Sequence, residues 1–160
     1  ALFMIRIAKL TDYGVVLMAE LARSTSDRLF TVADLTAATG IPQPTVSKLL
    51  KILAAGELLS SVRGAHGGYR LTRAASEITV ADVVVALQGP VAIVDCLGAA
   101  SACSHEADCA LKGPWERINR VLEVALQEMT LADVAGPRSP GAAGRDKTMA
   151  RAGRERGDDA

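Results

Sequence analysis

Residues 41–56, I-P-Q-P-T-V-S-K-L-L-K-I-L-A-A-G, decide the fold of this chain. Pro44 suits the first turn of a helix, where its missing N–H costs no hydrogen bond. The apolar residues that follow recur at helical spacing and predict one buried stripe: Val46, Leu49, Leu50 and Leu53. The opposite face is polar and basic and consists of Gln43, Thr45, Ser47, Lys48 and Lys51. Gly56 stands where we expect a left-handed cap to end the helix.

A shorter helix is predicted just before this stretch. Thr31 suits its N-cap, Asp34 three positions later completes a capping box, and Gly40 ends it. Two helices joined by a tight turn, the second with an exposed polar and basic face, form the helix-turn-helix pattern. The second helix of that motif enters the major groove of DNA. Ahead of the motif, apolar residues at steps of three and four predict another helix over residues 8–23.

A β-hairpin is predicted after the helix-turn-helix. Residues 59–63 and 69–71 suit two strands, and three glycines permit the turn between them: Gly64, Gly67 and Gly68. A hairpin in this position is a wing. Arg63 and Arg70 flank its tip, from which arginines can reach a narrow minor groove, and His66 lies on the tip. His66 as an ordinary solvent-facing loop residue is the alternative.

Two further helices are predicted in the second half. Thr79, with Asp82 three residues later, opens the first, and Gly89-Pro90 ends it. The longest helix covers residues 111–130 and has apolar residues at steps of three and four: Leu111, Trp115, Ile118, Leu122, Leu126 and Met129. We expect so long a stripe to pair with a second copy in a homodimer, with packing onto its own domain as the alternative.

Composition and charge favour a helical protein that contacts nucleic acid. Hydrophobic residues make up 49% of the 160 residues but aromatic ones only 3%, which favours an aliphatic helical core. Residues 43–73 hold five basic side chains against one acidic, whereas residues 95–133 hold three against seven. An uneven distribution of this kind is expected when one face meets phosphates.

Other classes of protein are disfavoured. No apolar run is long enough to span a membrane, so we expect a cytoplasmic protein with reduced thiols. No phosphate-binding glycine motif is present, and neither histidine has an evident nucleophile partner, so we do not expect an enzyme.

We therefore predict a mainly α fold with a small β-hairpin, a winged helix-turn-helix plus a long C-terminal dimerisation helix. Residues 4–73 form the winged helix-turn-helix DNA-binding domain in this prediction. Residues 74–134 form a loop with all three cysteines, followed by the dimerisation helix, and residues 135–160 form a disordered tail.

The three cysteines lie close together, at Cys96, Cys103 and Cys109. An odd number cannot form a complete set of disulfides within one chain. Thiolates select iron–sulfur clusters, zinc or cuprous copper, and such sites want about four ligands. Three cysteines therefore leave one position open, for which the candidates are His105, Glu106, Asp108 or a residue from elsewhere in the fold.

Three stretches carry a resemblance to a known family: L-T-D-Y-G-V-V-L-M at residues 10–18, S-S-V-R-G-A-H-G-G-Y-R-L at residues 60–71, and V-D-C at residues 94–96 followed by two further cysteines. The chain resembles, over about residues 4–134, the winged-helix iron–sulfur transcriptional regulators that include IscR, NsrR and the proteobacterial regulators of SUF cluster assembly. The resemblance implies a homodimer that binds an operator in double-stranded DNA. It also implies an iron–sulfur cluster, 2Fe–2S or 4Fe–4S, held by the three cysteines.

The resemblance also bears on the fourth ligand. IscR-like members use a histidine shortly after the third cysteine, whereas Lys112 occupies that region here and no histidine follows. Nitric-oxide-sensing members use an aspartate in the first helix of the other subunit, and Asp12 matches that position. His105 is the rival. The expected function is cluster-dependent regulation of transcription, of SUF genes in particular. The alternatives are a regulator whose cysteines bind zinc or act as a thiol redox switch, and a nitric-oxide-responsive repressor.

Overall fold

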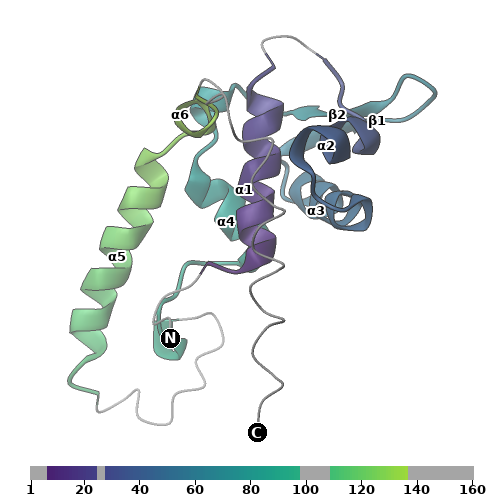
Figure 1. The fold of residues 1–160 in the computed structure, drawn as a ribbon. Helices are drawn as coiled ribbons and strands as arrows, with labels where there is room; N and C mark the ends of the chain where they lie inside the picture. The colour runs from purple at the N-terminus through teal and green to yellow at the C-terminus, as the bar shows by residue number, and fades with distance from the viewer. Residues whose placement is uncertain (1–6, 25–27, 98–108, 137–160) are drawn as a thin grey trace, which may run out of the picture.

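The fold was derived from a computed structural model, which describes residues 7–24, 28–97 and 109–136. Eight helices and strands follow one another in these ranges, with two one-turn 3₁₀ helices: α1 (Lys9–Ala22), α2 (Val32–Thr39), α3 (Gln43–Ala55), β1 (Leu59–Val62), β2 (Gly68–Leu71), η1 (Ala75–Glu77), α4 (Val80–Gln88), η2 (Asp95–Leu97), α5 (Lys112–Glu128) and α6 (Leu131–Val134). The helices α1 to α4 and the hairpin gather on one side, and α5 runs along the other (Figure 1). This architecture confirms the predicted fold class.

The helix-turn-helix of α2 and α3 forms as the sequence predicts. The Thr31 hydroxyl accepts the Asp34 N–H at 3.1 Å, and the Asp34 carboxylate accepts the Thr31 N–H at 2.9 Å. Gly40 ends α2 with a left-handed φ of 71°. The apolar stripe of α3 is fully buried, with no exposed surface on Val46, Leu49, Leu50 or Leu53. Burying that stripe turns the polar face of α3 outward.

The predicted left-handed cap at Gly56 is wrong. Gly56 has a φ of −81°, and the left-handed residue is Glu57, with a φ of 60°. The Glu57 N–H donates to the Ala54 carbonyl and the Leu58 N–H to the Leu53 carbonyl, which places the helix reversal one residue later. Gly56 provides space instead, because a Cβ there would lie 3.0 Å from the Cβ of Ala86 on α4.

The wing is an antiparallel pair in which Leu59 faces Leu71 and Val62 faces Gly68. The strands differ from the predicted bounds by one residue each, since β1 ends at Val62 and β2 begins at Gly68. Phe30, just before α2, bridges to Tyr69 through two backbone hydrogen bonds of 2.8 and 2.9 Å. The hairpin is thereby attached to the start of the helix-turn-helix.

The core continues beyond the predicted domain boundary at Arg73. Ile78, Val83 and Leu131 have no exposed surface and join the cluster built by α1, α2 and α3. The domain bounds themselves stay a prediction. Within the part of the chain that the structure describes, no helix is long and apolar enough to cross a membrane.

The chain returns to this core after the long helix. We predicted one helix as far as Thr130, but α5 ends at Glu128, and Thr130 caps the separate helix α6 through a capping box with Asp133. The Leu131 N–H donates to the Ile78 carbonyl at 2.8 Å, which docks α6 beside the start of α4. Ala135, in the predicted tail, is buried and accepts a hydrogen bond from Arg23 Nε at 3.1 Å. The remainder of that predicted tail, from residue 137, lies outside the described residues.

Candidate DNA-binding surface and cysteine site

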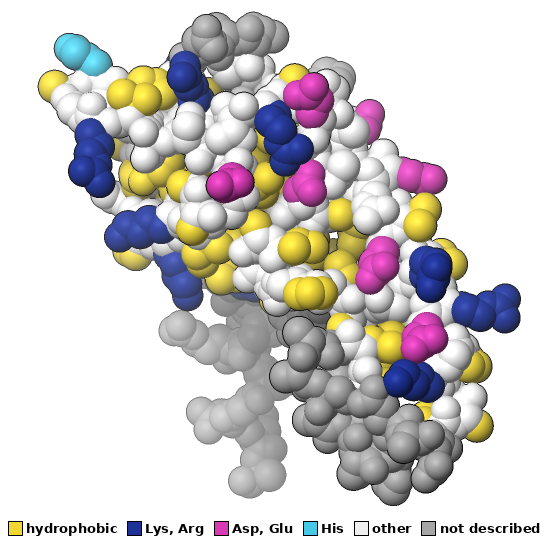
Figure 2. Space-filling model, turned by 180° about the vertical axis from the view of Figure 1, so that it is seen from behind, with side chains coloured by type: hydrophobic (Ala, Val, Ile, Leu, Met, Phe, Trp, Pro, Cys, Tyr) yellow, Lys and Arg dark blue, Asp and Glu magenta, His cyan; other side chains and the backbone are white. Residues whose placement is uncertain are grey.

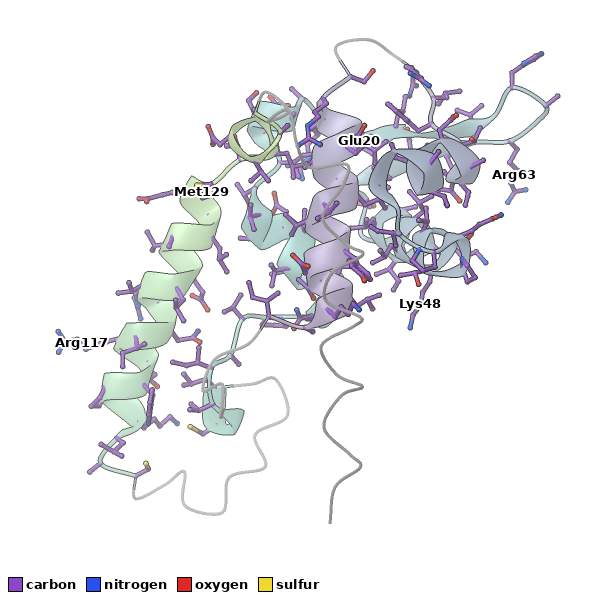
Figure 3. The ribbon with its side chains drawn as sticks, viewed as in Figure 1. Glu20, Lys48, Arg63, Arg117 and Met129 are labelled. Atoms are coloured by element: carbon purple, nitrogen blue, oxygen red, sulfur yellow. The ribbon has the colours of Figure 1, made fainter. Side chains whose placement is uncertain are left out.

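The polar face of α3 is available to a partner. The side chains of Gln43, Lys48 and Lys51 are exposed, while Thr45 and Ser47 are half-buried. Lys48 projects away from the body of the molecule on the side opposite α5 (Figure 3). The helix carries no acidic side chain. It therefore presents hydrogen-bonding and positively charged groups together, which are the groups that read base edges and contact phosphates.

The wing extends this surface. Arg63 and His66 are exposed in its loop, and Arg63 lies on the same side of the molecule as Lys48 (Figure 3). Lys and Arg side chains gather along the edge formed by the wing and α3, and the Asp and Glu side chains of that view lie elsewhere (Figure 2). Gly64 has a φ of 119°, and a Cβ on Gly67 would collide with the Val62 carbonyl, so the loop requires glycine at both positions.

Arg70 differs from the other predicted wing residues in its surroundings. It is exposed on β2, opposite Ser60, and it lines an open cavity of about 650 Å³ together with Arg28 and Arg73. Arg73 is 3.7 Å from Asp82, and the guanidinium of Arg28 lies over the ring of Phe30. Arg28 and Arg73 were not among the predicted site residues. Their signal in the sequence is weak, because lone arginines in loops are usually solvated.

Cys96 and Cys109 lie at the two ends of one segment. Cys96 belongs to η2, Cys109 precedes α5, and both are free and half-buried. Cys103 and His105, with Glu106 and Asp108, fall in residues 98–108, outside the described residues. Two free thiols fit the soft-ligand chemistry of an iron–sulfur site. In the described ranges, no three His, Cys, Asp or Glu side chains lie close enough together to hold a metal ion.

Asp12 is exposed in the first turn of α1. Its neighbour Thr11 is fully buried, and the Thr11 hydroxyl accepts a hydrogen bond from Gln88 Nε2 at the end of α4. The N-terminal end of α1 and η2 lie at the same end of the molecule (Figure 1). Ligation by Asp12 of a cluster in the other subunit stays a prediction.

Residues 89–97, here called the arm, connect α4 to Cys96 and are held by α5. Asn119 is only 7% exposed. Its Oδ1 accepts the Ile93 N–H at 3.1 Å, and its Nδ2 donates to the Val91 carbonyl at 2.9 Å and to Glu123 Oε1 at 2.8 Å. We did not predict a role for Asn119. The available signal was a polar residue four positions after Trp115 and three before Leu122, within the apolar stripe.

The outer face of α5 is apolar without a covering partner in the described chain. Ile118, Val121 and Val124 are 45%, 69% and 45% exposed. Val121 and Val124 line an open groove with Arg117 and Arg120. Trp115, Leu122 and Leu126, from the predicted stripe, are half-buried. One helix thus carries two apolar strips, of which only one meets the described part of its own chain.

Comparison with known proteins decides the family. The sequence pattern of the Rrf2 family, described as "Iron-dependent Transcriptional regulator", matches residues 7–137. This chain belongs to the Rrf2 family. The resemblance inferred from the three sequence stretches is therefore confirmed.

Curated relatives agree with this assignment. A Mycobacterium tuberculosis protein, named as an HTH-type transcriptional regulator, is 36% identical over 135 residues, which is 84% of each chain. The protein rrf2 of Nitratidesulfovibrio vulgaris is 31% identical over 122 residues, covering 76% of this chain and 81% of the relative.

Solved structures share the fold. CymR, the global cysteine regulator of B. subtilis, superposes with a TM-score of 0.68 at 25% identity, over 84% of this Rrf2 chain and 99% of CymR. IscR of T. potens superposes with a TM-score of 0.64 at 27% identity, over 81% and 85%. The Rrf2 family consists of transcriptional regulators and not of enzymes, so this protein is a DNA-binding regulator of transcription.

Proposed function

We propose that this Rrf2 protein is a homodimeric, cytoplasmic regulator of transcription whose operator binding depends on an iron–sulfur cluster, and that its targets are genes of SUF cluster assembly. The observation that carries the proposal is the placement of two free thiols, Cys96 and Cys109, at the ends of the segment that contains Cys103. The family description as iron-dependent and the likeness to IscR of T. potens support it.

The three cysteine thiolates would hold the cluster, and a bound cluster would supply a group whose loss or redox change can be sensed. Asp12 of the other subunit is the proposed fourth ligand. A carboxylate oxygen binds iron less strongly than a thiolate, which suits a ligand meant to be displaced. Thr11, next to Asp12, is hydrogen-bonded to Gln88. A displacement of Asp12 on ligation would therefore be transmitted to the end of α4 as well as to α1.

Operator binding would use the outward face of α3 in the major groove and the wing in the minor groove. Its proposed contacts are Gln43, Thr45, Ser47, Lys48, Lys51, Arg63, His66 and Arg70. The state of the cluster would set the spacing of the two recognition helices in the dimer. Half-sites one DNA turn apart, about 34 Å, require that spacing to be held.

Anaerobic purification tests the cluster. The protein should be coloured and should contain iron and acid-labile sulfide, and replacing any of the three cysteines by serine should weaken or abolish the colour. Stoichiometric zinc without sulfide would refute the cluster.

Operator titration tests the DNA surface. Lys48→Ala and Arg63→Ala should each weaken operator binding, because both side chains are exposed on the same side of the molecule (Figure 3). Loss of one phosphate contact should make the negative slope of log affinity against log salt shallower by about 1. Unchanged binding by both variants would remove α3 and the wing from the interface.

The fourth ligand is tested by Asp12→Ala beside His105→Ala. Asp12 is exposed, so its removal should leave folding intact while shortening the life of the cluster and loosening its control of DNA binding. His105→Ala should be nearly silent. The opposite pattern would transfer the fourth position to His105.

A thiol redox switch is the second candidate. It is favoured by the likeness to Staphylococcus aureus CymR, which has been solved in an oxidized form, and by the half-buried free thiols of Cys96 and Cys109. In that case the purified protein is colourless, and operator binding changes on oxidation and recovers with a thiol reductant.

A further inference from the structure

The arm that carries Cys96 is attached to α5 through one buried side chain. Val91 and Ile93 offer a backbone carbonyl and a backbone N–H, and both are satisfied by the amide of Asn119. An amide buried to this degree stays there only if its own polar atoms are paired. Glu123, one turn further along α5, accepts the second Nδ2 hydrogen and fixes which way the amide is turned.

Both ends of the segment that contains the cysteines are therefore connected to the same helix, α5. Cys96 comes three residues after Ile93, and Cys109 comes three residues before α5 begins. Leu97, next to Cys96, lines an open cavity together with Asn119, Glu116, Arg120 and Glu123, so η2 and α5 face each other across this cavity. The contact that binds the arm to α5 consequently sets where the first thiol lies relative to the last.

We propose that Asn119 is the positioning residue of the sensor site: its amide clamps the arm to α5 and holds Cys96 at a set distance from Cys109. This inference rests on the proposed function for its consequence, which is a longer-lived cluster. The clamp itself needs no cluster. Both polar atoms of the Asn119 amide already have hydrogen-bond partners, and an amide is a poor ligand for iron, so its role is to orient and not to bind.

The clamp is tested first without any metal. In a Cys103→Ser background, a flexible bifunctional maleimide joins Cys96 to Cys109 within one chain, and the rate of joining reports how closely the two thiols are held. Asn119→Ala should slow this reaction and speed hydrogen exchange at the Ile93 amide, because that N–H loses its acceptor. Glu123→Gln is the matched control. Its side chain keeps an acceptor for Nδ2, so both readouts should match the parent protein.

The consequence is then tested in the chain with all three cysteines. Residues that orient metal ligands typically change affinity by 10- to 100-fold, so Asn119→Ala should shorten the life of the cluster in air about ten-fold. Operator affinity of the cluster-free protein should stay within about two-fold, because α5, which carries Asn119, lies on the opposite side of the molecule from α3 (Figure 1). If Asn119→Ala does not fold, Asn119→Asp replaces it. The aspartate keeps the shape and the acceptor for Ile93 but loses both donors.

The outcomes separate the clamp from the proposed function. A parent protein that takes no cluster refutes the proposed function, while the joining rate and the Ile93 exchange still support or refute the clamp. If Asn119→Ala speeds exchange at the Ile93 amide but leaves the rate of joining unchanged, the clamp is overturned. It is also overturned if Cys96 and Cys109 do not join in the Cys103→Ser protein that keeps Asn119. An unchanged cluster lifetime in Asn119→Ala would overturn the role of the clamp in the sensor.

Discussion

At the scale of single residues, Gly68 controls how closely the wing approaches the rest of the protein. A Cβ on Gly68 would lie 2.7 Å from the Phe30 carbonyl oxygen, and backbone atoms of this kind cannot move aside independently. Gly68→Ala should therefore force β2 away from Phe30 and lower the free energy of unfolding by about 1–3 kcal/mol. Urea unfolding measures this, and operator affinity should fall because the wing is displaced.

Gly113→Ala is the matched comparison, with the opposite sign. Gly113 lies in the first turn of α5, and nothing stands within 4 Å of the added Cβ. Alanine should stabilise the protein by about 0.4–1 kcal/mol, because it loses less backbone freedom on folding than glycine. If both variants were destabilised equally, the loss at Gly68 would reflect glycine replacement in general and not the contact with Phe30.

At the scale of elements, capping boxes set the starts of three helices. α2, α4 and α6 each begin after a threonine whose hydroxyl accepts the N–H of an aspartate three residues later. These caps satisfy backbone donors that no carbonyl within the helix can reach. Helix starts at such places are local properties of four consecutive residues.

Two of these caps predict an acid dependence of stability. The hydrogen bond from the Thr31 backbone lowers the pKa of Asp34, and the hydrogen bond from the Thr130 hydroxyl lowers the pKa of Asp133, both from an ordinary value of 3.8. The unfolded chain therefore binds protons first as the pH falls. The stabilisation is complete above pH 3.8 and is lost as the pH falls through the lowered pKa values. Asp133→Asn should flatten this loss in a series of urea unfolding curves below pH 4, and an unchanged slope would contradict it.

The long helix α5 has an outer strip that predicts self-association. Val121 is 69% exposed, so Val121→Lys should not disturb the fold but should place a charge in any interface built on this strip. We expect the homodimer to dissociate to monomers, measured as molar mass by light scattering. Val62→Lys, at a 43% exposed position on the wing, should leave the mass unchanged. A dimer that survives Val121→Lys would place the interface elsewhere.

At the scale of the whole molecule, the return of the chain through α6 unites its two halves. Leu131 is fully buried in the core that α1 and α3 also form, and the Val80 N–H bonds to the Met129 carbonyl at 2.8 Å. The DNA-binding half and the half with the cysteines and α5 therefore share one core. A displacement of α5 would therefore be transmitted to that core by two connections, α6 and the arm.

Leu131→Ala tests this shared core. Removing a fully buried leucine should cost about 2–5 kcal/mol of unfolding free energy, because it leaves a cavity among α1, α4 and α6. The two halves should lose stability in a single cooperative transition. Ile7→Ala, at a 62% exposed position, should change stability by less than about 0.5 kcal/mol. Separate transitions for the two halves in the Leu131 variant would argue for independent domains.

The sequence by itself determined the elements whose signals are local. The stripe of α3, the capping boxes at Thr31 and Thr79, and the glycine turn of the wing each depend on side chains within a few positions, and the structure has all of them. The exposed face of α3 followed as well, because burying one side of a helix of known period orients the other side.

Only the tertiary structure decided the features that join distant positions. Gly56 is a glycine because Ala86 of α4 packs against it, Leu131 is buried because Ile78 lies beside it, and Asn119 sits in an apolar stripe because the arm needs its amide. Periodicity reports that a side chain is buried and not which segment buries it. A partner 26 or more residues away is chosen by the packing of the whole chain, and no local pattern of residues encodes that choice.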